Sequence, residues 1–191
     1  MSTFNANVVF NSADQALMTA IEKLNLRAVC RALDQGANPN LIHADGKSIV
    51  LELASRQYST DSTIWTIVQE LILAGADHLV TDAEGETLIH HAARCDEVDA
   101  IETLIAMDGL DVDVLDSEGR TPLFNAAAFS RVEAITVLLE YGADPLVTSN
   151  PDGVMGPDYQ PIDAIDYEDA GAFYVQALLN NAMEEAEGEE A

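Results

Sequence analysis

Basic residues are scarce in this sequence. Its 191 residues include 8 lysines and arginines against 34 aspartates and glutamates, which gives a net charge of −26. Neither lysine nor arginine occurs after Arg131, whereas fourteen acidic residues follow it. Because such a charge repels nucleic acid and anionic membrane surfaces, we expect the protein to bind neither of them directly.

Long apolar runs and closely spaced cysteines are also missing. No apolar run approaches the roughly 18 residues that a membrane span needs, and no charged-then-apolar segment at the N-terminus indicates a signal peptide. The two cysteines, Cys30 and Cys95, fit free thiols in a reducing compartment. We therefore expect a cytoplasmic protein. Separately, a content of 48% apolar residues is enough for a substantial core.

Residues that often carry catalysis or bind metals lack the spacing that those chemistries need. His90 and His91 are adjacent, so a helix points them to different sides. The acidic stretch Asp111–Glu118 lacks the glycine and the closing glutamate of a calcium loop. No phosphate-binding glycine loop or nucleophile elbow is present, and no residue stands out as a base for Cys95. We expect no catalytic residue, no metal site and no cofactor.

Glycines recur at a nearly constant interval along the chain. Four glycines that follow helical patterns lie 39, 34 and 33 residues apart, namely Gly36, Gly75, Gly109 and Gly142. A second set repeats the spacings of 39 and 34, namely Gly46, Gly85 and Gly119. Glycine readily takes the left-handed conformation that ends a helix. Two sets of landmarks with one period predict internal repeats.

One complete repeat is visible in the stretch Glu118–Pro145. Thr121 can cap a helix through its hydroxyl, and Pro122 fits the first helical position because its missing N–H would have no partner there. The pair Ala126–Ala127 leaves room for a neighbouring helix, and the run Val137–Leu139 gives a second helix an apolar face. Two short antiparallel helices follow, and such a unit buries its apolar face only when stacked on further copies.

This pattern resembles the ankyrin repeat. The opening Gly-Arg-Thr-Pro-Leu-Phe-Asn-Ala-Ala at 119–127 and the close Val-Leu-Leu-Glu-Tyr-Gly-Ala-Asp at 137–144 carry the resemblance. It implies an all-α fold, an ankyrin-repeat solenoid of stacked helix-turn-helix units with short β-turn fingers. It also implies that His90 is a scaffold residue bonded to the adjacent turn. In the second repeat, Ser48 can cap in place of threonine.

The register of the repeats divides the chain into an N-terminal arm (1–11), a single ankyrin-repeat domain (12–183) and an acidic disordered tail (184–191). Within the domain we expect an N-terminal capping repeat with helices at about 14–24 and 26–33. The expected repeats are 12–40, 41–77 with an insert at 57–63, 78–111, 112–144, and a C-terminal capping repeat at 145–183 with an enlarged finger at 150–160.

Partner-binding residues are expected at two kinds of position. By the resemblance, residues near the end of each first helix point into a concave face; they include Lys23, Arg56, His91, Arg94, Asn125 and Phe129. Two irregular loops add the aromatic residues Tyr58 and Tyr159. The first group predicts a locally cationic groove that fits a partner segment with acidic residues and an apolar anchor. The same residues also fit an ordinary solvated surface.

Two functions are consistent with these observations. The resemblance favours a non-catalytic module, monomeric on its own, that binds a specific protein partner through its concave face and irregular loops, as an adaptor or inhibitor. The alternative is an acidic mimic of nucleic acid, or an immunity-type inhibitor, that blocks a nuclease or another DNA-binding protein. The acidic exterior favours a basic or nucleic-acid-handling partner, whereas the predicted groove favours an acidic segment.

Overall fold

The computed structural model describes residues 11–43, 46–56, 62–145, 147, 179–180 and 182. This part of the chain is all-α and contains eight named helices, with one isolated antiparallel bridge between Ile42 and Ser48. The chain divides into two compact units, Met1–Asp82 (unit 1) and Ala83–Ala191 (unit 2). Continuity of one domain over 12–183 stays a prediction, and the finger 150–160 and the tail 184–191 lie outside the described residues.

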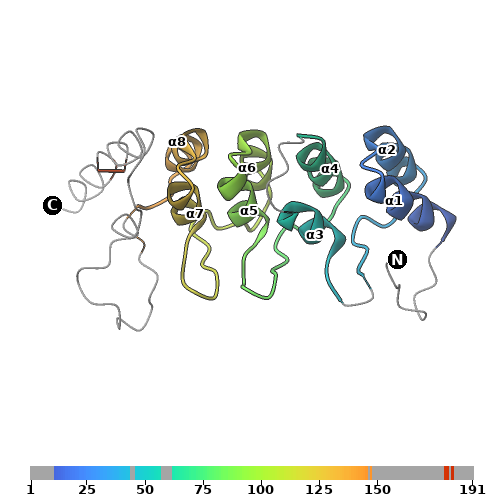
Figure 1. Ribbon diagram of the computed structural model, residues 1–191, viewed down its shortest axis with the longest axis horizontal. Coiled ribbons are helices and arrows are strands. Elements are labelled where there is room, and N and C mark those ends of the chain that lie inside the picture. The colour runs from blue at the N-terminus through green and yellow to red at the C-terminus, as the bar shows by residue number, and fades with distance from the viewer. Residues whose placement is uncertain are drawn as a thin grey trace. The chain divides into compact units, whose positions relative to one another are not determined.

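Unit 1 contains two helix pairs (Figure 1). Helix α1 (Ser12–Glu22) packs on α2 (Leu26–Asp34), and α3 (Ile49–Ser55) packs on α4 (Ser62–Leu73). Contact between α2 and α4 joins the pairs. The two helices expected in the first repeat are therefore confirmed. The first begins earlier than expected because Asn11 and Asp14 form a reciprocal capping box.

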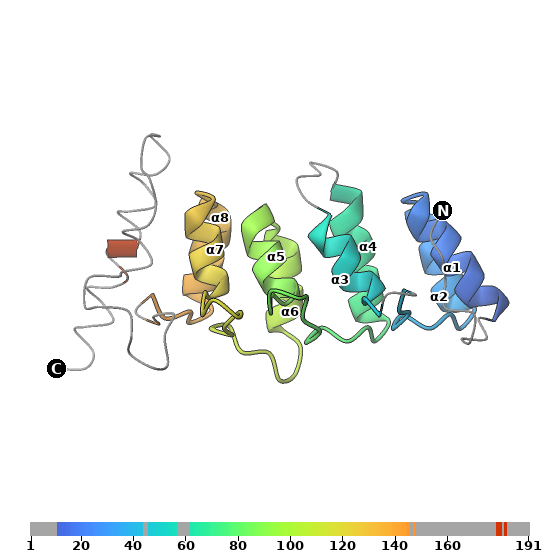
Figure 2. The ribbon, with the colours of Figure 1, turned by 60° about the horizontal axis from the view of Figure 1, so that its bottom comes forward.

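Unit 2 repeats this arrangement with α5 (Leu88–Cys95), α6 (Val98–Ile105), α7 (Pro122–Ala128) and α8 (Val132–Glu140). Helix α5 packs on both α6 and α7, and α8 packs on both α6 and α7. In Figure 2 the turn inside each helix pair lies at the end opposite the long loop that joins the two pairs. The α5–α6 and α7–α8 turns thus share one edge of unit 2.

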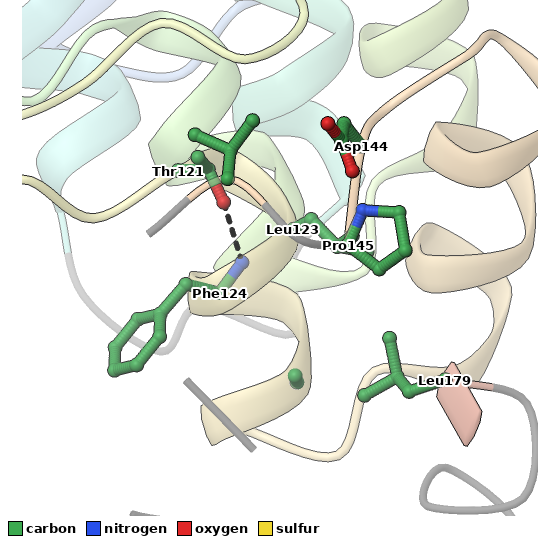
Figure 3. Close-up of a pocket in the computed structure, with 8 residues that line it drawn as sticks. Thr121, Leu123, Phe124, Asp144, Pro145 and Leu179 are labelled. Atoms are coloured by element: carbon green, nitrogen blue, oxygen red, sulfur yellow. Dashed lines mark hydrogen bonds between the residues drawn. The ribbon is translucent and has the colours of Figure 1, made fainter. Parts of the chain in front are cut away.

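Helix starts and ends follow the residues that the repeat pattern singles out. Thr121 Oγ1 accepts a hydrogen bond from the backbone N–H of Phe124 at 3.1 Å (Figure 3). Pro122 is the first residue of α7. Ser48 occupies the same position before α3, but its side chain makes no capping bond, so that prediction is wrong. The seven landmark glycines all have positive φ, from 75° at Gly119 to 97° at Gly75, which confirms the predicted register.

Fully buried aliphatic side chains form the core of each unit. In unit 1 they include Leu17, Ile49, Leu53, Ile67 and Leu71. In unit 2 they include Leu88, Ile89, Ile101, Leu104, Ile135, Leu138 and Leu179. Leu179 lines a pocket on the last helix pair together with Leu123, Pro145 and Val147 (Figure 3). The small side chains of Ala126 and Ala127, on α7, are also buried.

Side chains also tie neighbouring repeats together through backbone groups. In unit 1, Asn40 accepts a hydrogen bond from the N–H of Asp77 at 2.6 Å and donates one to the carbonyl of Gly75 at 2.9 Å. In unit 2, the carboxylate of Asp113 accepts from the N–H of Asp144 at 3.1 Å. Asn40 and Asp113 each stand four residues after a helix-ending glycine, so the two units use the same link at the same register.

A second link in unit 2 caps a helix from the neighbouring repeat. Asp96 follows α5 with a φ of 63°, and its Oδ1 accepts from the N–H of Ala134 in the first turn of α8 at 2.8 Å. Arg131, at the N-cap position of α8, makes no side-chain cap of its own. Asp96 therefore supplies the cap that α8 lacks.

Replacing Asp96 tests this cap. We expect Asp96→Gly, which tolerates the φ of 63°, to lower the free energy of unfolding by about 1 to 2 kcal/mol, because the N–H of Ala134 loses its acceptor. Asp96→Asn keeps an acceptor and tolerates positive φ, so its loss is expected to stay below about 0.5 kcal/mol. Urea unfolding followed by circular dichroism measures both. Equal losses of unfolding free energy in the two variants would show that Asp96 does not stabilise the protein by capping α8.

Candidate functional site

A buried carboxylate organises the side chains at the start of unit 2. Glu86 lies just before α5, and its side chain is 6% exposed. Its two oxygens accept hydrogen bonds from Nη1 of Arg94, on α5, at 3.0 and 2.9 Å. Nδ2 of Asn125, on α7, donates to Oε1 of Glu86 at 2.8 Å. One carboxylate thus links the finger, α5 and α7.

His91 completes this buried cluster. Its side chain is 2% exposed, and its Nδ1 lies 2.5 Å from Arg94 Nη2 and 3.7 Å from Glu86 Oε2. Burial alone would raise the pKa of Glu86, but the hydrogen bond from Asn125 and the charges of Arg94 and His91 together lower it below its ordinary value. Glu86 is therefore a carboxylate at neutral pH.

The cluster changes the interpretation of three residues expected in a concave groove. His91 does not project into a groove, because it is buried beside Glu86, and Asn125 is buried at 4% exposure. Arg94 keeps a 17% exposed side chain, but its guanidinium serves the Glu86 carboxylate. The physical reason is that a buried carboxylate needs charged and hydrogen-bonding partners, which α5 and α7 provide.

His90 has the scaffold role that the resemblance implies. Its Nδ1 accepts a hydrogen bond from the N–H of Thr87 at 3.2 Å, and its Nε2 lies 3.0 Å from the carbonyl oxygen of Arg120. A carbonyl only accepts, so Nε2 carries the proton and donates. His90 therefore joins the start of α5 to the next finger, as expected.

The finger before α7 holds its own arginine. The buried Asp116 accepts from the backbone N–H of Arg120 at 2.8 Å and from its Nε at 2.7 Å. Nη1 of Arg120 also pairs with Glu118 at 2.9 Å. Partial burial alone would lower the pKa of Arg120, but its bond to Asp116 and the neighbouring carboxylates raise it. Its charge is thus balanced within the finger.

Two basic residues of unit 1 are predicted to bind a partner, and one of them is in an ion pair while the other is exposed. Arg56 follows α3 and pairs with Glu52 at 3.1 Å, while the other oxygen of Glu52 lies 2.6 Å from Nε2 of His43. Lys23 is exposed at the end of α1. Partner-binding roles for Lys23, Arg56 and Phe129 stay predictions. Tyr58 and Tyr159 lie outside the described residues.

Carboxylates at the surface of unit 2 crowd one another. The pKa of Glu97 is raised by burial and by the charges of Asp99 and Asp96. The pKa of Asp96 is raised by burial and by Glu133, against the bond from Ala134. Burial and two acidic neighbours likewise raise the pKa of Asp113. Ionising these groups at neutral pH lowers the free energy of unfolding, and a cationic partner nearby would reduce this cost.

The opposing shifts predict a stability maximum on the acid side of neutrality. The raised pKa values of Asp96, Glu97 and Asp113 mean that stability is gained as pH falls through their folded-state pKa values. The lowered pKa of Glu86 means that its contribution, complete above its unfolded pKa of 4.5, is lost as pH falls further. We expect the free energy of unfolding to rise as pH falls from neutrality toward the folded-state pKa values of these three carboxyl groups, and to fall below about pH 4.5, where the contribution of Glu86 begins to be lost.

The double variant Asp96→Asn/Glu97→Gln checks the source of this rise. Because both substitutions remove a titrating carboxylate, we expect the increase on the acid side of neutrality to become smaller, while the loss at low pH remains. Denaturant unfolding at a series of pH values measures both. If the unfolding free energy rises as much in the variant, groups other than Asp96 and Glu97 cause the rise.

Charge is distributed unevenly between the two units. Unit 1 has nine acidic and five basic residues, a net charge of −4, whereas unit 2 has twenty-five acidic and three basic residues, a net charge of −22. The three arginines of unit 2 all bond within it: Arg94 to Glu86, Arg120 to Asp116, and Arg131 to the carbonyl of Arg94. Unit 2 is therefore a strongly anionic body whose guanidinium groups have internal partners.

The family model for ankyrin repeats in three copies matches residues 53–149, about half of the chain. The chain therefore belongs to the ankyrin-repeat family. Ankyrin repeats are generally protein–protein interaction modules, and the family is typically non-catalytic. No curated protein matches the chain. None of the helices in the described ranges has the length and apolar character needed to cross a bilayer.

Proposed function

We propose that the protein is a non-catalytic binding module that docks a protein partner with a basic surface, and that unit 2 carries this interaction. The observation behind the proposal is the charge of −22 in unit 2 against −4 in unit 1, with the arginines of unit 2 bonded internally. A field of this strength speeds the encounter with a cationic partner and disfavours an acidic one.

The crowded carboxylates support the same partner. Asp96, Glu97 and Asp113 have pKa values that burial and neighbouring charges raise. A bound lysine or arginine would relieve this repulsion, so part of the electrostatic cost of folding becomes binding free energy. The sign of the partner is the reverse of that predicted from a cationic groove, because Arg94 serves Glu86.

Binding of a defined peptide tests the proposal. The probe is a fluorescein-labelled peptide of four Lys-Ala-Leu-Arg repeats, compared with its Glu-Ala-Leu-Asp counterpart by fluorescence anisotropy. We expect only the basic peptide to bind, with an affinity that falls at least about tenfold between 50 and 300 mM salt. Binding of the acidic peptide, or no binding of either, would contradict the proposal.

Matched variants assign the binding to a unit. Glu102→Gln/Glu133→Gln removes two exposed carboxylates from unit 2, and Glu22→Gln/Asp34→Asn removes two from unit 1. We expect the first variant to weaken binding about tenfold and the second less than about twofold. Equal weakening by both would mean that the charge acts as a whole and that unit 2 has no special part.

A further inference from the structure

The edge of unit 2 formed by the α5–α6 and α7–α8 turns combines an exposed aromatic ring with several carboxylates. Phe129 follows α7 and is 39% exposed. Glu97 and Asp99 begin α6 next to the α5–α6 turn, and Glu133 lies in the first turn of α8. Asp99 and Glu133 are exposed and Glu97 is half-buried. We call these four residues the Phe129 edge.

Hydrogen bonds hold the two turns of this edge together. Arg131 donates from its backbone N–H to the carbonyl of Ala126 at 2.8 Å, which closes the turn that carries Phe129. Its Nε donates to the carbonyl of Arg94, at the end of α5, at 2.8 Å. The bond from Ala134 to Asp96 makes a second link between the turns. Phe129 and the carboxylates are thus presented on a fixed backbone, which limits the entropy lost on binding.

The charges on this edge favour cations. Arg131 is the basic residue in the two turns, and its charge acts on Asp96, which also interacts with Glu133. The charged neighbours of Glu97 are the carboxylates of Asp99 and Asp96. An exposed phenyl ring offers an apolar contact, and its face attracts a lysine or arginine side chain. We propose that the Phe129 edge docks a basic peptide segment with an apolar side chain, in which the apolar group packs on Phe129 and the cations pair with the surrounding carboxylates.

This proposal rests on the proposed function, because it names where unit 2 would hold its basic partner. It differs from the groove predicted from the sequence, in which Phe129 accompanies Arg94 and the partner is acidic. Arg94 is bonded to Glu86, and the three carboxylates of the Phe129 edge outnumber Arg131, so the proposed partner is basic. Phe129 keeps the anchoring role, with a partner of the opposite charge.

Two peptides separate the apolar contact from the charge. The first has four Lys-Ala-Leu-Arg repeats, and the second has four Lys-Ala-Ser-Arg repeats, with the same charge and no leucine. We expect Phe129→Ala to weaken binding of the first peptide about tenfold and of the second less than about twofold. Tyr141→Ala is the matched control, because Tyr141 is an aromatic residue that follows α8, at its other end, and is 49% exposed. We expect it to change neither affinity by more than about twofold.

Charge variants complete the experiment. We expect Glu97→Gln/Asp99→Asn to weaken both peptides about fivefold or more, and Glu140→Gln/Asp108→Asn, which removes two exposed carboxylates elsewhere in unit 2, to weaken them less than about twofold. If the basic peptides bind but the edge variants behave as their controls do, the Phe129 edge is wrong and the proposed function stands. If neither peptide binds, both proposals fail.

Discussion

Glu86→Ala is expected to lower the free energy of unfolding by about 3 to 4 kcal/mol. The carboxylate accepts two hydrogen bonds from Arg94 and one from Asn125. Its removal leaves a largely buried guanidinium and a buried amide without an acceptor, while the gain in apolar burial is small. Urea unfolding monitored by circular dichroism measures the loss.

Two further variants show whether the loss comes from the ion pair. Glu86→Gln keeps the volume and one acceptor oxygen but turns an amide N–H₂ toward Arg94, so we expect a loss of about 2 kcal/mol. In the double variant Glu86→Ala/Arg94→Ala the loss is expected to be at least about 1 kcal/mol smaller than the sum of the single losses. Additive losses, or a loss below about 1 kcal/mol for Glu86→Ala alone, would contradict the described cluster.

Gly85→Ala is expected to lower the free energy of unfolding by about 2 to 4 kcal/mol, for two independent reasons. Gly85 has a φ of +77°, where an L side chain costs about 1 to 2 kcal/mol. An added Cβ would also lie 2.8 Å from the backbone nitrogen of Ser117, whose N–H donates to the carbonyl of Glu84 at 2.9 Å. Relief of that contact must move one finger away from the next.

Gly142→Ala is the matched control for this prediction. Gly142 has a φ of +86°, but a Cβ built on it meets nothing within 4 Å. Only the conformational cost remains, so we expect a loss of about 1 to 2 kcal/mol, at the low end of the loss expected for Gly85→Ala or below it. A loss for Gly85→Ala no larger than that for Gly142→Ala would show that the two fingers are not held in contact.

The fold could be predicted from the sequence because its landmarks act locally. Each landmark glycine needs a positive φ whatever packs around it, and Thr121 with Pro122 defines a helix start from its own backbone chemistry. The same local reasoning failed at Ser48, which stands at the N-cap position but makes no capping bond. A suitable residue type permits a cap without requiring it.

The site was harder to predict because burial depends on stacking. Near the end of a first helix, the position of Arg94 looks exposed in any single repeat. Glu86 is buried in the structure, so that arginine pairs with it instead of facing a partner. Asn125 of the next repeat donates a hydrogen bond to the same carboxylate. One signal was present in the sequence: Lys47 and Arg120 follow the other two finger glycines, whereas Glu86 follows Gly85. An acid at that position, with an arginine eight residues later, favours an internal ion pair.

The partner's charge is the central claim, and an unbiased selection tests it most directly. A library of random peptides displayed on phage is selected against the purified protein at 150 mM salt, and the net charge of the recovered peptides is compared with that of the starting library. We expect the recovered peptides to be enriched in lysine and arginine and to carry a large apolar residue. Recovery of peptides that are on average neutral or acidic would contradict the claim that this ankyrin-repeat protein binds a basic partner.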